Sequence, residues 1–239
     1  MSRVFRVRII LPTINEEKNI SRVISQLHKH GYTDIIVVDG HSTDNTVECA
    51  RQLGAKVICQ KGKGKGNALR QGFEDSRFDF DAVIILDADG SMAPRELSLF
   101  VDTIKKGADV VKGSRFIGNG GSKDFSLLRR VGNTILTTTF NLLFLTRYTD
   151  LCYGYMAFSK KAINELLPVL NSDGFEIETE ICARSNLLGM SIREVPSFEY
   201  PRYSGVSNLN AFRDGTKIMG VILKMFTDNV RKQKNEINT

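Results

Sequence analysis

The first half of the sequence alternates short apolar runs with helical patterns, and this alternation constrains the fold more than any other feature. Apolar runs lie at residues 7–11, 34–39, 56–60, 81–86 and 108–112. Between them, the spacing of apolar residues and the capping residues predict helices over 16–30, 44–53, 67–75 and 94–107. Strands and helices that alternate in this way form a mostly parallel sheet with helices on both faces. The sequence therefore predicts an α/β fold with a Rossmann-like central sheet.

The second half of the sequence does not continue this regular alternation of strands and helices. It predicts an extended segment, a strand and several amphipathic helices, with a basic tail on the last helix. In chain order these are a helix at 127–146, an extended segment at 148–159, helices at 160–167 and 177–188, a strand at 192–200 and a helix at 210–231. Because no linker, internal repeat or low-complexity stretch interrupts the chain, we expect one domain over 1–239, with halves at 1–113 and 114–239.

The segment 127–146 is the most apolar of the predicted helices. One side carries the apolar residues Leu128, Val131, Ile135 and Leu142, together with Leu136, Phe140 and Leu143, and the other carries Thr134, Thr137, Thr138 and Asn141. Arg129 and Arg130 stand at its start and Arg147 follows its end. Two interpretations remain open: a helix packed on the core with its arginines reaching into solvent, or an amphipathic segment that rests on anionic lipid.

Net charge and cysteine content indicate the kind of partner and the cellular compartment. The net charge of +6 favours anionic partners such as phosphates or acidic lipid headgroups. The four cysteines have no CxxC spacing, which fits a reducing compartment rather than a zinc or disulfide framework. Neither a signal peptide nor a run of about 18 apolar residues is present. We therefore expect a cytoplasmic protein.

Asp87-Ala88-Asp89 is the strongest candidate for a metal site. The triplet follows the buried apolar run 81–86 directly and precedes Gly90, and small Ala88 lets the backbone bend between the two acids. Carboxylate oxygens at a strand end suit Mg²⁺ or Mn²⁺, which would in turn hold a diphosphate. Such a triplet in isolation also fits a solvated turn, and its place after a buried strand favours the metal site.

Two further segments follow predicted strands. Asp39 ends the apolar run 34–39, where it fits either a turn or a hydrogen bond to a ribose or base. The loop 61–66 alternates lysine with glycine, so it fits either a phosphate cradle or a flexible solvated loop. It lacks the spacing of a Walker A loop and of a Rossmann glycine fingerprint. Because ligands of parallel sheets bind at the carboxyl ends of the strands, the loops after 11, 38, 60 and 86 should line one crevice.

Other chemistries fit less well. His41 has no nucleophile partner and no Gly-x-Ser-x-Gly elbow is present, which disfavours a hydrolase triad. A nucleotidyltransferase would usually carry a basic glycine-rich segment where Thr13-Ile14-Asn15-Glu16 stands. A non-enzymatic basic module for membrane surfaces stays open. Nucleic acid is not expected as a partner, because aromatic residues are not interleaved with a basic patch.

Six segments resemble the family 2 glycosyltransferases of GT-A fold, in particular dolichol-phosphate mannosyltransferase and other polyprenyl-phosphate glycosyltransferases. The resemblance runs over nearly the whole chain, and the segments stand in the order and spacing of the family. They are Leu11-Pro12-Thr13-Ile14-Asn15-Glu16-Glu17, Val38-Asp39-Gly40-His41-Ser42-Thr43-Asp44, Gly64-Lys65-Gly66-Asn67-Ala68, Leu86-Asp87-Ala88-Asp89-Gly90, Gly113-Ser114-Arg115-Phe116 and Tyr200-Pro201-Arg202-Tyr203-Ser204-Gly205-Val206-Ser207.

The resemblance implies roles for individual residues. The donor nucleotide would contact Pro12, Thr13, Asn15, Glu16, Asp39, Lys65, Asp87 and Ala88. Asp87 and Asp89 would hold Mg²⁺ or Mn²⁺, and Arg115, Arg202 and Ser207 would meet the diphosphate or the acceptor phosphate. Asp89, Asp150 and Arg202 would be catalytic, while Glu178 and Glu180 fall in the acidic helical segment of the family. The half 1–113 would bind the nucleotide sugar and the half 114–239 the acceptor.

The implied reaction is the inverting transfer of a hexose from a GDP-mannose or UDP-glucose type of donor to a polyprenyl or dolichyl phosphate. The alternative acceptor is a sugar hydroxyl of a soluble or cell-surface glycan, for which Asp150 or Glu178 would have to take a proton. Two departures from the family are visible: Ser91 stands where relatives often have a metal-binding glutamine, and no transmembrane helices follow the catalytic segments. The resemblance thus implies a peripheral enzyme on the cytoplasmic face of a membrane, held by an amphipathic surface or a membrane-protein partner.

Overall fold

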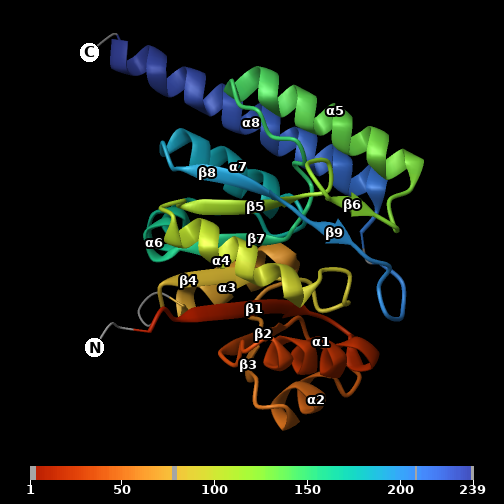
Figure 1. The fold of residues 1–239 in the computed structure, drawn as a ribbon. Helices are drawn as coiled ribbons and strands as arrows, with labels where there is room; N and C mark the ends of the chain where they lie inside the picture. The colour runs from red at the N-terminus through yellow and green to blue at the C-terminus, as the bar shows by residue number, and fades with distance from the viewer. Residues whose placement is uncertain (1–3, 77–79, 208, 238–239) are drawn as a thin grey trace.

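The computed structural model describes residues 4–76, 80–207 and 209–237 of the chain. Its centre is a seven-stranded, mostly parallel sheet in the order β3-β2-β1-β4-β7-β5-β8 (Figure 1). The strands, in chain order, are β1 (Val7–Thr13), β2 (Ile35–Asp39), β3 (Lys56–Cys59), β4 (Ala82–Ile85), β5 (Val110–Ser114), β7 (Met156–Ser159) and β8 (Ile192–Pro196). The predicted fold class is confirmed. Strand β7 runs antiparallel to both of its neighbours, β4 and β5.

Helices cover both faces of the sheet, and each face has its own core. The helices are α1 (Glu17–Lys29), α2 (Thr46–Gln52), α3 (Lys65–Asp75), α4 (Leu97–Lys105), α5 (Leu127–Phe144), α6 (Lys160–Leu166), α7 (Ile177–Leu187) and α8 (Ala211–Ile237), with 3₁₀ turns at Pro94–Glu96 and Leu167–Val169. Alternate residues of a strand point to opposite faces. Accordingly Ile9 and Leu11 of β1 pack with α1 and α4, and Ile10 packs with α3, α6 and α7.

The predicted strand at 192–200 is wrong in one respect, because the structure divides it. Its first part is β8 in the large sheet, and its second part is β9 (Phe198–Glu199), which pairs with β6 (Gly121–Ser122) in a separate two-stranded sheet. Ser197 lies between the two parts and is held by the carboxylate of Glu96. This break carries Glu199 and the segment after it over the carboxyl ends of the strands, where the candidate site lies.

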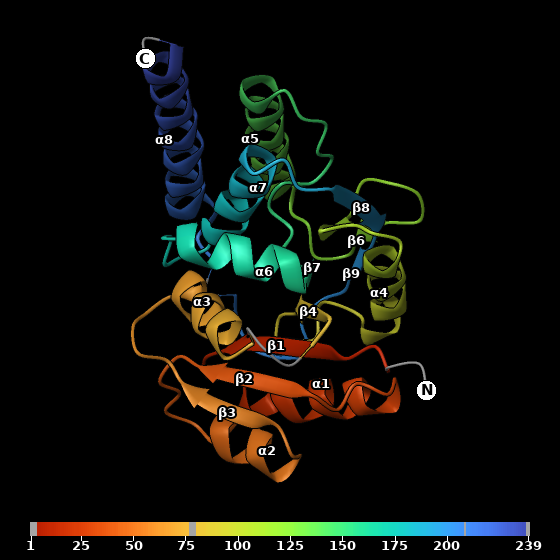
Figure 2. The same ribbon diagram turned by 90° about the vertical axis from the view of Figure 1, so that its left-hand side faces the viewer.

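The single apolar face predicted for 127–146 is also wrong. Leu136 and Phe140 of α5 are buried against α8, α7 and the sheet, whereas Leu128, Ile135 and Leu142 are exposed. Thr137, assigned to the polar side, is buried because its hydroxyl accepts a hydrogen bond from the backbone N–H of Leu151. Helices α5 and α8 lie side by side at one end of the molecule and run in the same direction (Figures 1 and 2).

Candidate active site

A cavity of about 530 Å³ opens at the carboxyl ends of the strands. One side is formed by the residues that follow β1, β2, β3 and β4, as the sequence predicts. The other side comes from the second half of the chain and includes Arg115, Tyr153, Glu178 and the segment after β9. Of the predicted site residues, the cavity is lined by Pro12, Thr13, Glu16, Lys65, Asp87, Ala88, Asp89, Arg115, Arg202 and Ser207.

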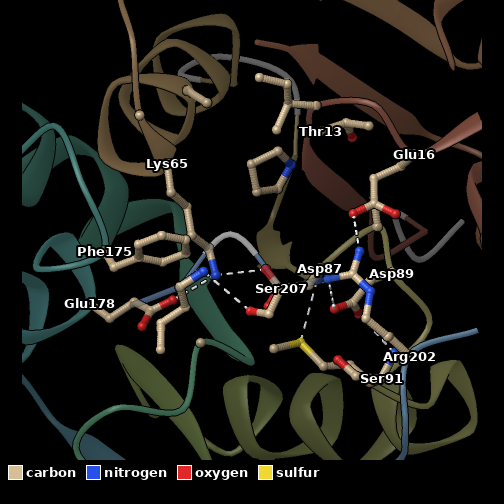
Figure 3. A pocket seen from close by; sticks show the side chains of 18 of the residues that line it. Thr13, Glu16, Lys65, Asp87, Asp89, Ser91, Phe175, Glu178, Arg202 and Ser207 are labelled. Carbon is tan, nitrogen blue, oxygen red and sulfur yellow. Dashed lines mark hydrogen bonds and ion pairs between the residues drawn. The ribbon is translucent and has the colours of Figure 1, made fainter. Parts of the chain in front are cut away.

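The Asp87–Asp89 turn lies in the middle of this cavity (Figure 3). Strand β4 ends at Ile85, and Leu86 leads directly into the turn. Asp89 is fixed by the backbone N–H of Ser91, which donates to its Oδ1 at 2.9 Å, and Ala88 is buried. Burial and the neighbouring carboxylate of Asp87 raise the pKa of Asp89 above its ordinary value. The turn therefore concentrates negative charge that a cation would stabilise.

Lys65 joins the two halves of the cavity. Its Nζ lies 2.6 Å from Oδ1 of Asp87 and 2.7 Å from Oε1 of Glu178, so one ammonium bridges the β4 turn and helix α7 (Figure 3). Burial would lower the pKa of Lys65, but the two carboxylates overcome this and raise it above its ordinary value. Lys65 is thus a fixed cation beside the aspartate turn, at the start of helix α3.

Arg202 approaches the same turn from the segment after β9. Its Nη2 lies 2.6 Å from Oε1 of Glu16, and its Nη1 lies 3.9 Å from Oδ2 of Asp89. Its Nε donates to the carbonyl oxygen of Ser204, which fixes the plane of the guanidinium. Burial raises the pKa of Glu16, and the hydrogen bond from Asn19 and the charge of Arg202 oppose this. Two cations, Lys65 and Arg202, therefore flank Asp87 and Asp89 from opposite sides.

The carboxylates of Asp87 and Asp89 suit a divalent cation that is completed by a ligand. Across the described residues, no cluster of three or more His, Cys, Asp or Glu side chains is arranged to hold a metal ion. Mg²⁺ commonly binds through one or two carboxylates together with substrate phosphates and water. The two hard oxygen donors fit such an ion, with the hydroxyl of Ser91 as a neighbouring oxygen.

Only some of the residues predicted to bind the nucleoside line the cavity. Pro12, Thr13 and Glu16 line the cavity, whereas Asn15 lines a smaller adjoining hollow and accepts a hydrogen bond from the backbone N–H of Thr43. Asp39 is buried and accepts from the backbone N–H of Ser42. Asp39 therefore supports the turn whose Gly40 and His41 reach the cavity, and it does not line the cavity itself.

The glycine-lysine loop packs closely on a second segment. A Cβ added at Gly64, where φ is +89°, would lie 2.2 Å from the carbonyl oxygen of Asp173, and one at Gly66 would lie 2.2 Å from that of Ser172. The backbone N–H of Gly66 donates to the Asp173 oxygen at 2.8 Å. These glycines allow close backbone approach, and this contact sets Lys65 in place. The contact argues against the flexible, solvated interpretation of the loop.

Arg115 and Asp150 form a buried ion pair. Nε and Nη2 of Arg115 donate to the two carboxylate oxygens of Asp150 at 2.7 and 2.9 Å, and Nη1 donates to Glu199 at 3.0 Å. Asp150 is fully buried, does not line the cavity and also accepts from the backbone N–H of Arg115. Burial opposes the charge of Arg115, but Asp150 and Glu199 raise its pKa above the ordinary value. The guanidinium of Arg115, to which the resemblance gives a phosphate-binding role, is thus bound by carboxylates.

Several lining residues were not singled out as site residues from the sequence. Phe175 lies beside Lys65, and Glu199 accepts from Arg115 and from the hydroxyl of Ser122. Arg129 and Arg213, at the first turns of α5 and α8, also line the cavity. The two arginines start helices that are separated by more than 60 residues, and no sequence spacing indicates that they meet at one cavity.

Comparison with known proteins assigns the chain to a family. Residues 8–167 match the family model described as glycosyl transferase family 2. The chain is 37% identical over 210 residues to glycosyltransferase AglJ of Haloferax volcanii, which covers 87% of this chain and 68% of the relative. It is 29% identical to polyprenol monophosphomannose synthase of Mycolicibacterium smegmatis, over 95% of this chain and 88% of the relative.

The fold is shared with a solved glycosyltransferase. Glucosyl-3-phosphoglycerate synthase of Mycobacterium tuberculosis, solved with Mn²⁺, UDP and phosphoglyceric acid, superposes with a TM-score of 0.72 and 20% identity over 93% of this chain and 78% of that chain. At this identity the likeness shows the fold alone. The family match sets aside the nucleotidyltransferase and the passive binding module. The chain is a glycosyltransferase, and it belongs to family 2 with a GT-A fold.

Proposed function

We propose that this glycosyltransferase moves a hexose from a nucleoside-diphosphate sugar to a polyprenyl phosphate, with inversion at the anomeric carbon. The observation that most strongly supports this proposal is that the carboxylates lining the cavity are paired with basic side chains. Among the described residues, each lies within 4 Å of a lysine or arginine nitrogen. They are Glu16, Asp87, Asp89, Asp124, Glu178 and Glu199. The cavity therefore offers no unpaired carboxylate as a general base, and His41, the histidine among its lining residues, belongs to the turn that would face the nucleoside rather than the acceptor.

An acceptor that is already ionised removes the need for such a base. A phosphate monoester has its second pKa near ~6, so it is largely dianionic at neutral pH. A sugar hydroxyl, in contrast, must lose a proton as it attacks. The buried pairing of Asp150 with Arg115 and of Glu178 with Lys65 therefore favours the phosphate acceptor over a glycan hydroxyl. We assign Asp150 a positioning role through Arg115.

The donor would bind along the first half of the chain, residues 1–113. Thr13, Glu16 and the turn after Asp39 would face the nucleoside, and Lys65 and Arg202 would face the diphosphate. Mg²⁺ or Mn²⁺ held by Asp87 and Asp89 would supply positive charge to the leaving diphosphate. Arg202 and Lys65 would stabilise the same developing charge as the acceptor oxygen bonds to the anomeric carbon and the bond to the diphosphate breaks.

The acceptor would enter along the second half, residues 114–239. Arg129 and Arg213 line that end of the cavity, and the side chain of Arg213 is 62% exposed and ion-paired only with its neighbour Asp214 among the described contacts. These arginines and Ser207 are the groups that we expect at the acceptor phosphate. Because such an acceptor is a membrane lipid, the enzyme would work at a membrane surface, on the cytoplasmic side.

Two measurements test the proposal. Thermal shifts with GDP-mannose, UDP-glucose and UDP-N-acetylglucosamine, each with Mn²⁺ or Mg²⁺, should show metal-dependent stabilisation by one donor. With that donor, transfer to a short-chain, water-soluble polyprenyl phosphate should exceed transfer to the matching polyprenol at every pH from 6 to 8. Equal transfer to the alcohol, or stabilisation by none of the donors, would count against the proposal.

A further inference from the structure

An exposed apolar stripe runs along helix α5. It consists of Leu128, Val131, Ile135 and Leu142 together with Leu145, which follows the helix. The four members within the helix are three, four and seven residues apart in succession, a spacing that places them on one helix face. Leu142 is 72% exposed and Leu145 is 91% exposed. The stripe faces away from the core, because Leu136, Phe140 and Phe144 fill the buried side of the same helix.

Helix α8 lies beside α5 and also exposes large apolar side chains. It packs along α5 and runs in the same direction, and its Phe212 is 83% exposed while Leu223 is also exposed (Figure 2). Monomeric proteins rarely leave so many large apolar side chains in solvent on adjoining elements without an interaction partner. The α5 stripe with Phe212 and Leu223 is named the α5–α8 face below.

The charges around the α5–α8 face are basic. Helix α5 contains no acidic residue, and Arg130 and Arg147 are exposed at its two ends. Helix α8 adds the exposed basic residues Arg213, Lys217, Lys224, Arg231, Lys232 and Lys234, against the exposed acid Asp228. An apolar face bordered by basic side chains matches the interfacial zone of a bilayer that contains anionic lipid. No helix in the described part of the chain combines the length and the apolar character that crossing a membrane requires.

The α5–α8 face also begins at the candidate active site. Arg129 in the first turn of α5 and Arg213 in the first turn of α8 line the cavity at its acceptor end. A bilayer that covered the face would therefore meet the cavity at the depth of the lipid headgroups. That is the depth at which the phosphate of a membrane-embedded acceptor lies.

We propose that the α5–α8 face docks in the plane of an anionic membrane leaflet and presents the acceptor end of the cavity to lipid headgroups. The inference rests on the proposed function in one respect, the lipid nature of the acceptor. Docking itself needs no substrate, because it depends on apolar burial and on the basic border. It can be measured with vesicles alone.

The test compares Ile135→Glu with Leu99→Glu. Both change an exposed aliphatic residue to an acid, and Leu99 lies on α4, which packs on the other face of the sheet. Wild type and Leu99→Glu should cosediment with phosphatidylcholine vesicles that contain phosphatidylglycerol, and less so in high salt. Ile135→Glu should bind about tenfold more weakly, because it loses apolar burial and adds a charge that anionic lipid repels. Leu142→Glu provides an independent second variant.

Transfer to a short-chain, water-soluble polyprenyl phosphate separates docking from catalysis. Ile135→Glu should retain it and lose transfer only to long-chain acceptor in vesicles. Wild-type transfer in solution without vesicle binding would overturn the docking surface and leave the proposed function standing. Vesicle binding without transfer to any polyprenyl phosphate would do the reverse. A dimer that Ile135→Glu dissociates, seen by analytical ultracentrifugation, would assign the face to a second copy and overturn the inference.

Discussion

The ring of Tyr203 lies directly against Gly90. A Cβ added at Gly90 would come within 2.3 Å of the ring, and the backbone N–H of Tyr203 donates to the carbonyl oxygen of Asp89 at 2.9 Å. The guanidinium of Arg22 covers the ring at 3.9 Å from its centre. This contact fastens the segment after β9 onto the aspartate turn, and it brings the adjacent Arg202 to Glu16 and Asp89.

Gly90→Ala should therefore weaken both stability and donor turnover. Gly90 has φ +82°, where an alanine is strained, and the new methyl group would displace Tyr203. We expect the free energy of unfolding to fall by ~1–3 kcal/mol and kcat with the donor to fall with it, as measured by urea unfolding and initial rates. Gly220→Ala is the control: its Cβ meets open space within α8, so the free energy of unfolding should rise by up to about 1 kcal/mol. Equal behaviour of the two variants would refute the role of the contact.

Lys65→Met should destabilise the protein strongly. The substitution leaves the buried carboxylate of Glu178 without its cation, and breaking a buried pair in this way costs about 3–5 kcal/mol. The double variant Lys65→Met/Glu178→Gln should recover part of the lost free energy of unfolding. Lys61→Met, in the same loop but exposed, should change it by no more than about 0.5 kcal/mol. A small effect of Lys65→Met in chemical unfolding would contradict the bridging arrangement.

Asp150→Asn separates a positioning residue from a general base. Because Asp150 is fully buried on Arg115, we expect a loss of about 3–5 kcal/mol of unfolding free energy. Turnover with polyprenyl phosphate should fall, because Arg115 loses the carboxylate that positions it. The pH dependence of turnover should stay that of the wild type. An alkaline shift or the loss of a titration in the kcat profile would instead show that Asp150 takes a proton.

Asp89→Asn should remove the metal-dependent part of donor binding. A neutral amide in place of the carboxylate is a weaker ligand for Mg²⁺ or Mn²⁺. The thermal shift produced by donor plus metal should drop to the value seen with donor and chelator. Asp102→Asn, on the exposed side of α4, should retain the full shift. Retention of the metal effect in Asp89→Asn would remove Asp89 from the metal site.

The cysteines should differ in reactivity. Burial raises the pKa of Cys152 to about 12 and that of Cys182 to about 11, so at pH 8 both thiols are protonated and the reactive thiolate is rare. Cys59 is exposed and its sulfur lies 3.8 Å from Nδ1 of His41, which lines the cavity. Iodoacetamide followed by mass spectrometry should label Cys59 first, and bound nucleotide sugar should slow that labelling. Equally rapid labelling of Cys152 in the folded protein would contradict its raised pKa.

The sequence alone determined the parallel strands of the first half and one side of the cavity, whereas the antiparallel place of β7 between β4 and β5 appears only in the structure. Apolar strands that each end in Pro12-Thr13, Asp39 or Asp87 predict loops that converge, because the carboxyl ends of parallel strands share one edge. Those loops do converge in the structure, and the motifs that they carry resemble those of the family.

Only the tertiary structure decided which charged groups meet. Lys65 and Glu178 are 113 positions apart, and Arg115 and Asp150 are 35 apart, so neither pairing follows from local spacing. The buried residues of the helix 127–146 likewise could not be predicted from the sequence. Its sequence predicts one apolar side, but the packing of α8 buries only Leu136, Phe140 and Phe144, and the backbone of Leu151 buries Thr137. Helical periodicity reports which residues share a face, whereas burial depends on what packs against that face.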